Sequence, residues 1–268
     1  MLKLPNIASN LKCWRTINQL VFGRNINCPV CTNSMAENYK LKYLWCSACR
    51  KKYRPTAFKG SWLYGTKLSS KQLFLLIWCW QNKKSPDTAC LLVQASYTTV
   101  RRWYRRFRDH LPDCREILNG VVQVDESYFG KLKSKQDQLI VVGAIEQEER
   151  KIKLSITNSR SREAIEGFVI NSIRTDSLVV SDKWYAYDEL HFFGYYHESW
   201  NHSKGHFAGT NQIEGLWSII KRYLRKLYGC VPTNNLEPIL NEFMARMNKP
   251  ILFKSPETYL KNCLFHFS

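Results

Sequence analysis

The stretch VVQVDESYFG, from Val121 to Gly130, decides the fold of the C-terminal half of this 268-residue chain. Its β-branched and aromatic residues predict a β-strand, and two adjacent acids, Asp125 and Glu126, stand toward its end. Apolar runs at 138–146 and 151–157 are bounded by polar turn residues and predict two further strands. The C-terminal half is therefore expected to begin with three successive strands.

The elements that follow set the order of a mixed sheet. Residues 161–173 have the N-terminal cap and spacing of an amphipathic helix, and a fourth strand is expected from Ser177, ending at Asp182. Three strands, a helix and a strand form the order of an RNase H-like core, so the predicted fold class is α+β or α/β. In that fold the first and fourth strands are neighbours, and Asp125 and Asp182 should meet. Glu126 should face the opposite side and serve as a structural partner.

A later helix, TNQIEGLWSIIKRYLRKL, offers a third acid. Glu214 lies off its buried stripe, and Lys221, seven residues on, shares the Glu214 face. Three carboxylates can hold two Mg²⁺ ions for phosphoryl transfer, and the lysine would steer a DNA backbone. The alternative is that the acids are solvated carboxylates at strand ends. The expected buried stripe of this helix consists of Ile213, Leu216, Trp217, Ile220, Leu224 and Leu227.

The N-terminal part contains two cysteine pairs, CPVC and WCSAC, with the spacing C-x2-C-x14-C-x2-C. Two such knuckles predict one structural Zn²⁺ held by Cys28, Cys31, Cys46 and Cys49. The alternatives are four unrelated core cysteines or a redox pair. Basic residues that include Lys51 and Arg54 alternate with aromatic ones around the knuckles, which is typical of a nucleic-acid-binding ribbon, although zinc ribbons also bind proteins.

Between these parts lies a predicted helix-turn-helix. After a helix over 69–81, Ser85 and Pro86 predict the start of a helix that reaches about Gln94, and a second helix should begin near Thr98. Such a second helix can enter a major groove, with arginines on phosphates and bases. The alternative is a solvated basic face on an ordinary helical pair. The arginines proposed to contact DNA are Arg101, Arg102 and Arg105.

The charge distribution supports a division of labour. The net charge is +18; residues 1–120 hold 21 Lys and Arg against 5 Asp and Glu, and residues 121–268 hold 19 against 17. A basic half joined to a nearly neutral half indicates a module for a polyanion beside a module with another task, although a generally basic surface is the alternative. The longest apolar run, 73–80, is far shorter than the roughly 20 residues of a membrane span, and the N-terminus has no ordinary signal-peptide pattern. We expect a soluble intracellular protein.

The stretches DESYFG, SDKWYAY, HESWNHSKGHF, TNQIEGLWSIIKR and EFMARMN, preceded by the four-cysteine ribbon, resemble the DDE transposases of bacterial insertion sequences of the ISXO type, related to the eukaryotic Merlin transposons. The resemblance spans about 28–248. It implies an enzyme that binds the terminal inverted repeats of its element, cuts at the ends and joins them to target DNA with Mg²⁺ or Mn²⁺. It also implies that the catalytic acids are Asp125, Asp182 and Glu214, and that synapsis of two ends requires at least a dimer.

Several assignments stay open at this point. Asn211 stands one helical turn before Glu214 and could be the third metal ligand instead, or a DNA contact. The family segment at 197–207 is expected to be a loop near the site, with His202 positioning substrate rather than binding metal. A silent DNA-binding regulator derived from a transposase, and a plain nuclease or resolvase, are the alternative functions. The location is cytoplasm or nucleoid in a bacterium and nucleus in a eukaryote.

The expected domains follow from these motifs. They are a zinc ribbon at 24–56, a helical helix-turn-helix region at 62–116 and an RNase H-like domain at 118–268.

Overall fold

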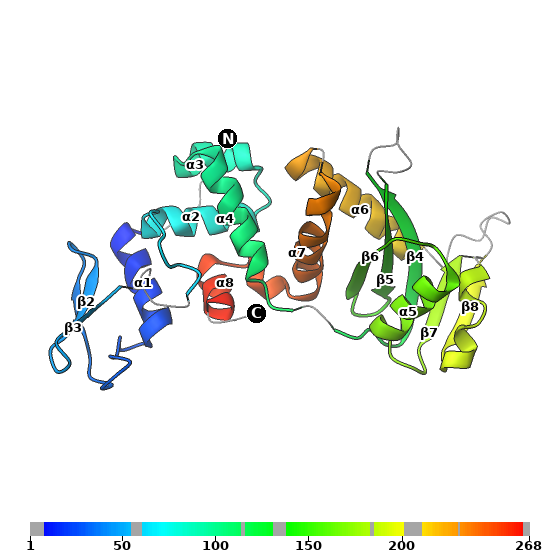
Figure 1. Ribbon diagram of the computed structural model, residues 1–268, viewed down its shortest axis with the longest axis horizontal. Coiled ribbons are helices and arrows are strands. Elements are labelled where there is room, and N and C mark those ends of the chain that lie inside the picture. The colour runs from blue at the N-terminus through cyan, green and yellow to red at the C-terminus, as the bar shows by residue number, and fades with distance from the viewer. Residues whose placement is uncertain are drawn as a thin grey trace. The chain divides into compact units, whose positions relative to one another are not determined.

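The computed structural model describes residues 8–54, 61–113, 116–130, 138–182, 185–200, 211–229 and 231–264 (Figure 1). The chain forms two compact units. One consists of Met1–Pro112 together with Ile251–Ser268, and the other of Asp113–Pro250. None of the helices in the described ranges is long and apolar enough to cross a membrane.

The unit 113–250 is built on a five-stranded mixed sheet in the order β6-β5-β4-β7-β8. β4 pairs antiparallel with β5 and parallel with β7, so the predicted neighbourhood of the first and fourth strands is confirmed. The strands are β4 (Val121–Phe129), β5 (Leu139–Glu146), β6 (Ile152–Thr157), β7 (Leu178–Asp182) and β8 (Tyr196–Trp200). The RNase H-like mixed α/β class is thereby confirmed.

β8 corrects one expectation, because part of the predicted loop 197–207 is a strand. Tyr196–Trp200 pairs in parallel with β7, Tyr196 opposite Leu178 and Trp200 opposite Asp182. The strand lies at the edge of the sheet, where one side needs no partner strand and polar residues are tolerated. A polar edge strand of this kind gives little hydrophobic pattern to detect.

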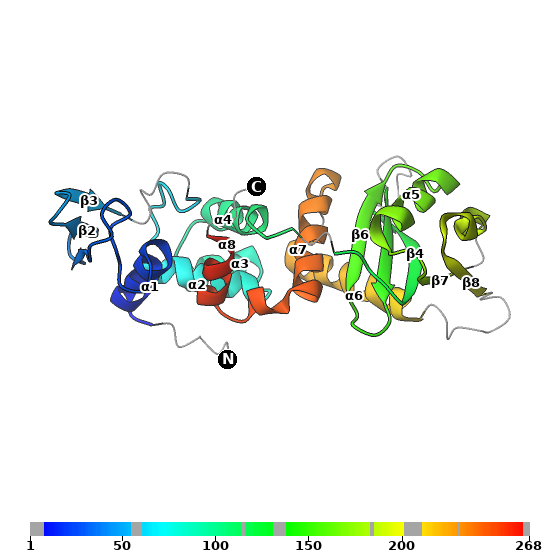
Figure 2. The same ribbon diagram turned by 90° about the horizontal axis from the view of Figure 1, so that it is seen from below.

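Helices cover both faces of this sheet, with α5 (Arg162–Ser172) on one side and α6 (Asn211–Tyr228) on the other (Figure 2). The alternation of β4 explains the arrangement. Val122 and Val124 point into the apolar cluster that includes Ile165 and Val169 of α5. Gln123, which lies between them on β4, faces α6. The strand therefore has one apolar face and one face with polar residues.

A further helix closes the edge of the sheet at β6. α7 (Leu236–Asn248) meets Ile152, whose N–H donates to Asn248 Oδ1 (2.9 Å) and whose carbonyl accepts from Asn248 Nδ2 (2.8 Å). The Asn248 amide thus takes the place of a neighbouring strand. In α6 the expected stripe is confirmed as buried: Ile213, Leu216, Trp217, Ile220, Leu224 and Leu227.

The other unit is helical, with a small ribbon sheet. Ser69, Ser85 and Ser96 cap the three central helices with their side chains, as expected from the sequence for Ser85. The ribbon strands form one antiparallel sheet. The elements are α1 (Asn10–Phe22), β1 (Ala36–Asn38), β2 (Tyr43–Cys46), β3 (Lys51–Tyr53), α2 (Ser70–Gln81), α3 (Pro86–Val93), α4 (Tyr97–Asp109) and α8 (Pro256–Cys263).

The last helix departs from the expected domain limits. The sequence places 251–268 in the RNase H-like domain, whereas α8 packs into the helical unit. Tyr259 is fully buried there and donates its hydroxyl to the carbonyl of Phe107 (2.8 Å), and Gln81 Nε2 donates to Leu252 O and Ser255 O, both at 2.8 Å. The sequence of α8 does not indicate which unit buries its apolar face. A prediction from sequence order therefore assigns this helix to the preceding domain.

Candidate active site and metal centre

Two acids lie opposite one another on neighbouring parallel strands. Gln123 of β4 pairs with Val180 of β7, and the same register continued by two residues brings Asp125 opposite Asp182. Because side chains alternate along a strand, both acids face the same side as Gln123 and Val180. The sequence prediction that these carboxylates converge agrees with this register.

The Asp125 carboxyl is held in a poorly solvated place. Burial raises its pKa to about 6, and the negative charges of Glu126 and Asp182 add to the rise, while hydrogen bonds from the Trp217 indole and the Glu126 backbone oppose it. A carboxylate that is buried beside like charges is unfavourable without a cation. The site therefore has the electrostatic character of a cation-binding pair of oxygen ligands.

Helix α6 is fixed to this face of β4 by polar contacts. Gln123 Oε1 accepts from the backbone N–H groups of Gln212 (3.0 Å) and Ile213 (3.1 Å), which are orphan donors of the first helical turn. One turn later, Trp217 Nε1–H donates to Asp125 Oδ2 at 2.9 Å. The start of α6 is thus tied to the strand that carries the first acid.

Glu214 lies in the first turn of α6, exposed, three residues before Trp217 and hence on a neighbouring part of the helix surface. Asn211 is the exposed first residue of the same helix. Within the described part of the chain, Glu214 does not join Asp125 and Asp182 in a ready-made cluster of three ligands.

Lys221 lies seven residues after Glu214 on α6, near the end of β4. Its Nζ is 5.6 Å from the ring centroid of Phe129, at the end of β4 and about 13 Å along the strand from Asp125 at ~3.3 Å per residue. It lines a cavity of about 810 Å³ together with Arg225 and Tyr128. Two cations on one wall give this end of the site a positive lining.

Glu126 points to the other face, as expected, and its role there is structural. Its side chain is 1% exposed, accepts from Tyr187 (2.6 Å) and pairs with Arg160 Nη2 (2.8 Å). Burial raises the Tyr187 pKa well above its ordinary value, with Glu126 adding to the rise. These two partners satisfy Glu126 within the protein, so it has little need of a metal.

The contacts of His197 are those of a packed residue and do not indicate a second metal site. His197 on β8 lies 2.9 Å from Ser181 Oγ and stacks on Tyr187, and burial lowers its pKa. These contacts account for it as a packed residue. The expected contact His202 lies outside the described residues, as does His206.

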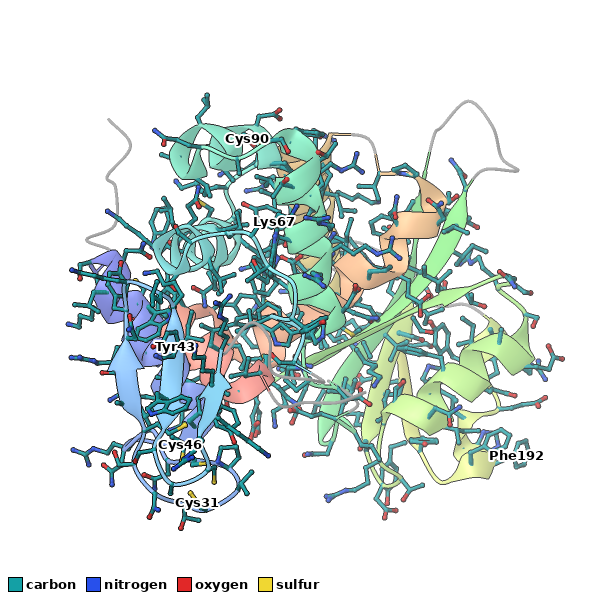
Figure 3. All side chains as sticks on the ribbon, turned by 60° about the vertical axis from the view of Figure 1, so that its left-hand side comes forward. Cys31, Tyr43, Cys46, Lys67, Cys90 and Phe192 are labelled. Atoms are coloured by element: carbon teal, nitrogen blue, oxygen red, sulfur yellow. The ribbon has the colours of Figure 1, made fainter. Side chains whose placement is uncertain are left out.

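The four cysteines of the ribbon come together as expected. The sulfurs of Cys28, Cys31, Cys46 and Cys49 all lie within 4.8 Å of one another, a spacing that can hold one metal ion. Cys31 and Cys46 lie at the same end of the ribbon in Figure 3. The backbone N–H of Cys49 donates to Cys46 Sγ (3.4 Å), as in a ligand-orienting knuckle. The cluster has the ligand set of a zinc ribbon.

The basic residues expected to contact DNA are on the surface. Arg101, Arg102 and Arg105 are exposed on α4, while Val100, Trp103 and Phe107 of the same helix are buried. Lys51, at the start of β3, and Arg54, just after it, are exposed in the ribbon. The buried and exposed residues of α4 separate as the helical period predicts.

Sequence reasoning misses the polar contacts that hold the acids and the start of α6 in place. It assigns Trp217 to the buried stripe alone and gives no role to Gln123, Arg160 and Tyr187. Only Gln123 leaves a signal: it is a polar residue on the same side of a strand as Asp125, two residues earlier. The other three contacts join segments far apart in the chain, which no local pattern records.

Comparison with known proteins identifies the domain that holds the acids. The family model of the ISXO2-like transposase domain matches residues 117–248, which run from just before β4 to the end of α7. Residues 117–248 belong to the ISXO2-like transposase domain family. The resemblance seen in the sequence is confirmed, and this part of the chain is a DDE transposase domain at the level of the family. No curated protein matches the chain.

Solved structures that are similar to parts of this chain include a viral integrase core and a viral intasome. The HTLV-2 integrase catalytic core domain in complex with magnesium, in its trimeric form, is 14% identical, with a TM-score of 0.36; the match covers 50% of this chain and 87% of that chain. The simian T-cell lymphotropic virus intasome in complex with PP2A regulatory subunit B56 gamma is 12% identical, with a TM-score of 0.36, and the match covers 72% of this chain and 75% of that one.

Proposed function

We propose that the chain is a DNA transposase that binds the terminal inverted repeats of its element and catalyses cleavage and strand transfer with divalent cations. The observation that carries the proposal is the parallel pairing of β4 with β7, whose register, continued by two residues, brings Asp125 and Asp182 to one level, where the charge of Asp182 acts on Asp125. The donors fit a hard cation such as Mg²⁺ or Mn²⁺, which prefers carboxylate oxygens. The raised pKa of Asp125 supports the same reading, because a cation would stabilise its charge.

The residues have separate tasks in this proposal. Asp125 and Asp182 hold two cations, with Glu214 as the third ligand and Asn211 as the alternative. When bound, two such ions activate an attacking hydroxyl and stabilise the leaving oxygen of a phosphodiester. Lys221 holds a backbone phosphate of the DNA at the far end of β4, where a second cation, Arg225, shares the cavity wall.

The N-terminal unit supplies DNA recognition in the same proposal. One Zn²⁺ bound by the four cysteines folds the ribbon, which contributes Lys51 and Arg54. α4 follows α3 as the second helix of a helix-turn-helix and presents Arg101, Arg102 and Arg105 to a groove. Asn211 and His202 are proposed as further DNA contacts. Two ends must be held together for strand transfer, so the working species is at least a dimer, in an intracellular compartment that contains DNA.

The test is end cleavage of a duplex that carries the inverted repeats flanking this coding region, with Mg²⁺ or Mn²⁺. Asp125→Asn and Asp182→Asn should reduce cleavage to background while binding the duplex as the wild type does. Glu163→Gln, which removes an exposed carboxylate of α5 on the opposite face, is the matched control and should cleave normally. Comparison of Glu214→Gln with Asn211→Ala identifies the third ligand, since only the ligand's loss should abolish cleavage.

Three results would argue against the proposal. Equal loss of DNA binding in the Asp125 and Asp182 variants would make these acids structural. Binding of end DNA by the wild type without any cleavage or joining under Mn²⁺ would favour a silent DNA-binding regulator. Cleavage of DNA without regard to its end sequence would favour a plain nuclease.

A further inference from the structure

One glycine, one tryptophan and the first acid form a continuous contact across the sheet. Asp125 of β4 is the direct antiparallel partner of Gly143 of β5. The six-membered ring of Trp217 lies on Gly143: a Cβ built there would be 2.5 Å from Trp217 Cη2 and 2.8 Å from Cζ2. The other end of the same indole donates its N–H to Asp125 Oδ2 at 2.9 Å.

The steric part of this contact leaves no room for a larger residue. Real Cβ atoms do not approach other heavy atoms within 3.0 Å, and the obstructing atoms belong to a rigid ring inside the protein. Leu154 Cδ2, on the next strand, lies 3.1 Å from the same Cβ position, so the Cβ would be crowded from a second side as well. Gly143 therefore permits a position of the indole that any other residue would displace.

The hydrogen bond is of an unusual kind for a packed tryptophan. In the helical unit, buried Trp62 donates its N–H to the backbone carbonyl of Cys263 at 3.2 Å, an ordinary way to satisfy an indole. Trp217 instead donates to one oxygen of a side-chain carboxylate, where the bond is charge-assisted and fixes the carboxylate's rotation. Oδ2 of Asp125 is thereby engaged by the indole, which sets the rotation of the carboxylate and hence the direction of its other oxygen.

We propose that Trp217 is a positioning residue for the metal site: its indole N–H engages one oxygen of Asp125 and orients the other oxygen toward the cation, and Gly143 is the opening in the sheet that admits the ring. The inference rests on the proposed function, because it takes Asp125 as a cation ligand. Partners that orient a metal ligand in this way affect metal affinity nearly as the ligands do.

The test measures Mn²⁺ binding to the full-length, zinc-loaded protein by electron paramagnetic resonance, without DNA. Trp217→Phe keeps an aromatic ring at this position of α6 and removes the N–H donor, together with the part of the indole that lies on Gly143. It should weaken Mn²⁺ binding by about 10- to 100-fold, the usual effect of removing a ligand's hydrogen-bond partner. Asp125→Asn should remove the binding altogether.

Tyr223→Phe is the matched control. Tyr223 lies on the same helix, is buried, and donates to a buried carboxylate, Glu242 Oε1, at 2.5 Å. Its substitution removes one donor to a carboxylate away from Asp125, so it can lower the unfolding temperature but should leave Mn²⁺ affinity within about twofold of the wild type. A general loosening of α6 would weaken binding in both variants and would contradict the positioning role.

The outcomes separate this inference from the proposed function. If Asp125→Asn abolishes Mn²⁺ binding while Trp217→Phe leaves it unchanged, the positioning role is wrong and the metal site stands. If Asp125→Asn has no effect on Mn²⁺ binding, the proposed metal site itself is wrong.

A measurement on the wild-type protein guards against a Trp217→Phe variant that does not fold. In ¹⁵N-labelled protein, the Trp217 indole N–H resonance should shift on addition of Mg²⁺ and be broadened by Mn²⁺, whereas the Trp62 indole resonance should not change. An unchanged Trp217 resonance at Mg²⁺ concentrations that support binding would overturn the inference. Gly143→Ala should displace the ring and move the same resonance before any metal is added.

Discussion

At the scale of single residues, the two adjacent acids of β4 differ in how their buried charges are stabilised. Glu126 is satisfied within the protein by an ion pair with Arg160 and a hydrogen bond from Tyr187. Asp125, on the other face, keeps a pKa of about 6, chiefly because burial disfavours its charge. The charge of Asp125 is unfavourable in the protein by itself, whereas the charge of Glu126 is paired. A cation would therefore act on the face of β4 that carries Asp125.

The first prediction concerns the cost of that buried charge. The pKa of Asp125 is raised above its unfolded value of about 3.9, so the folded state binds more protons between pH 4 and 6 and loses stability as pH rises through that range. Asp125→Asn should therefore raise the unfolding temperature of Mg²⁺-free, zinc-loaded protein at pH 7.5, by several degrees at roughly 2–4 °C per kcal/mol. At pH 4.5 the gain should fall to about a third of that value. Calorimetry at both pH values checks this, and a variant less stable than wild type at pH 7.5 would contradict it.

A second prediction at the same scale concerns zinc. Cys28 lies in a cluster whose sulfurs can hold one ion, and the ribbon has a small core of its own. We expect about one equivalent of zinc per purified chain by atomic emission, and its release in Cys28→Ser, because a ribbon of this size needs its metal to fold. Cys90→Ser, a half-buried cysteine on α3, is the control and should retain the metal. Zinc that remains bound after Cys28→Ser would exclude this site.

At the scale of elements, sequence patterns locate most of the fold and only part of the site. The strands at β4 to β7, the helix α5 and the capped helices α3 and α4 follow from period, caps and turn residues. The meeting of Asp125 with Asp182 follows from a topology in which first and fourth strands pair. β8 escapes prediction because it is a polar edge strand, and the Trp217–Asp125 bond escapes it because the bond depends on the packing of α6 on β4, a property of tertiary structure.

The prediction at the element scale concerns α4. Arg101, Arg102 and Arg105 are exposed, and the ion pair between Arg105 and Asp109 is long, at 3.9 Å, so these guanidinium groups are accessible to DNA. Alanine at each position should weaken binding of end DNA and flatten the slope of log K against log salt by about 0.9 for each DNA phosphate that is no longer neutralised. Lys254→Ala, an exposed cation outside the helix-turn-helix, is the control. Fluorescence anisotropy across a salt series measures both quantities, and unchanged slopes would leave α4 as a solvated basic face.

At the scale of the whole molecule, the chain crosses from the helical unit to the transposase domain and returns. The strongly basic first 120 residues and the nearly neutral remainder match this division only approximately, because 251–268 belong structurally to the basic unit. The core of the N-terminal unit thus includes residues from the other end of the sequence. A boundary drawn from motifs alone would cut through the core of the helical unit.

The last prediction concerns the packing of α8 into the helical unit. A chain that ends at residue 250 lacks Tyr259, Leu260 and Cys263, which are all 0% exposed in the helical core. Removing Tyr259 and Leu260 alone costs about 1.5–3 kcal/mol each, a large share of the 5–15 kcal/mol that stabilises a typical domain. We expect the truncated protein to lose the unfolding transition of the helical unit and its affinity for end DNA, while Mn²⁺ binding at Asp125 persists. Lys261→Ala, on the exposed side of α8, should change neither. Calorimetry and anisotropy together decide, and end-DNA binding by the truncated chain at full strength would show that α8 is dispensable to the unit into which it packs.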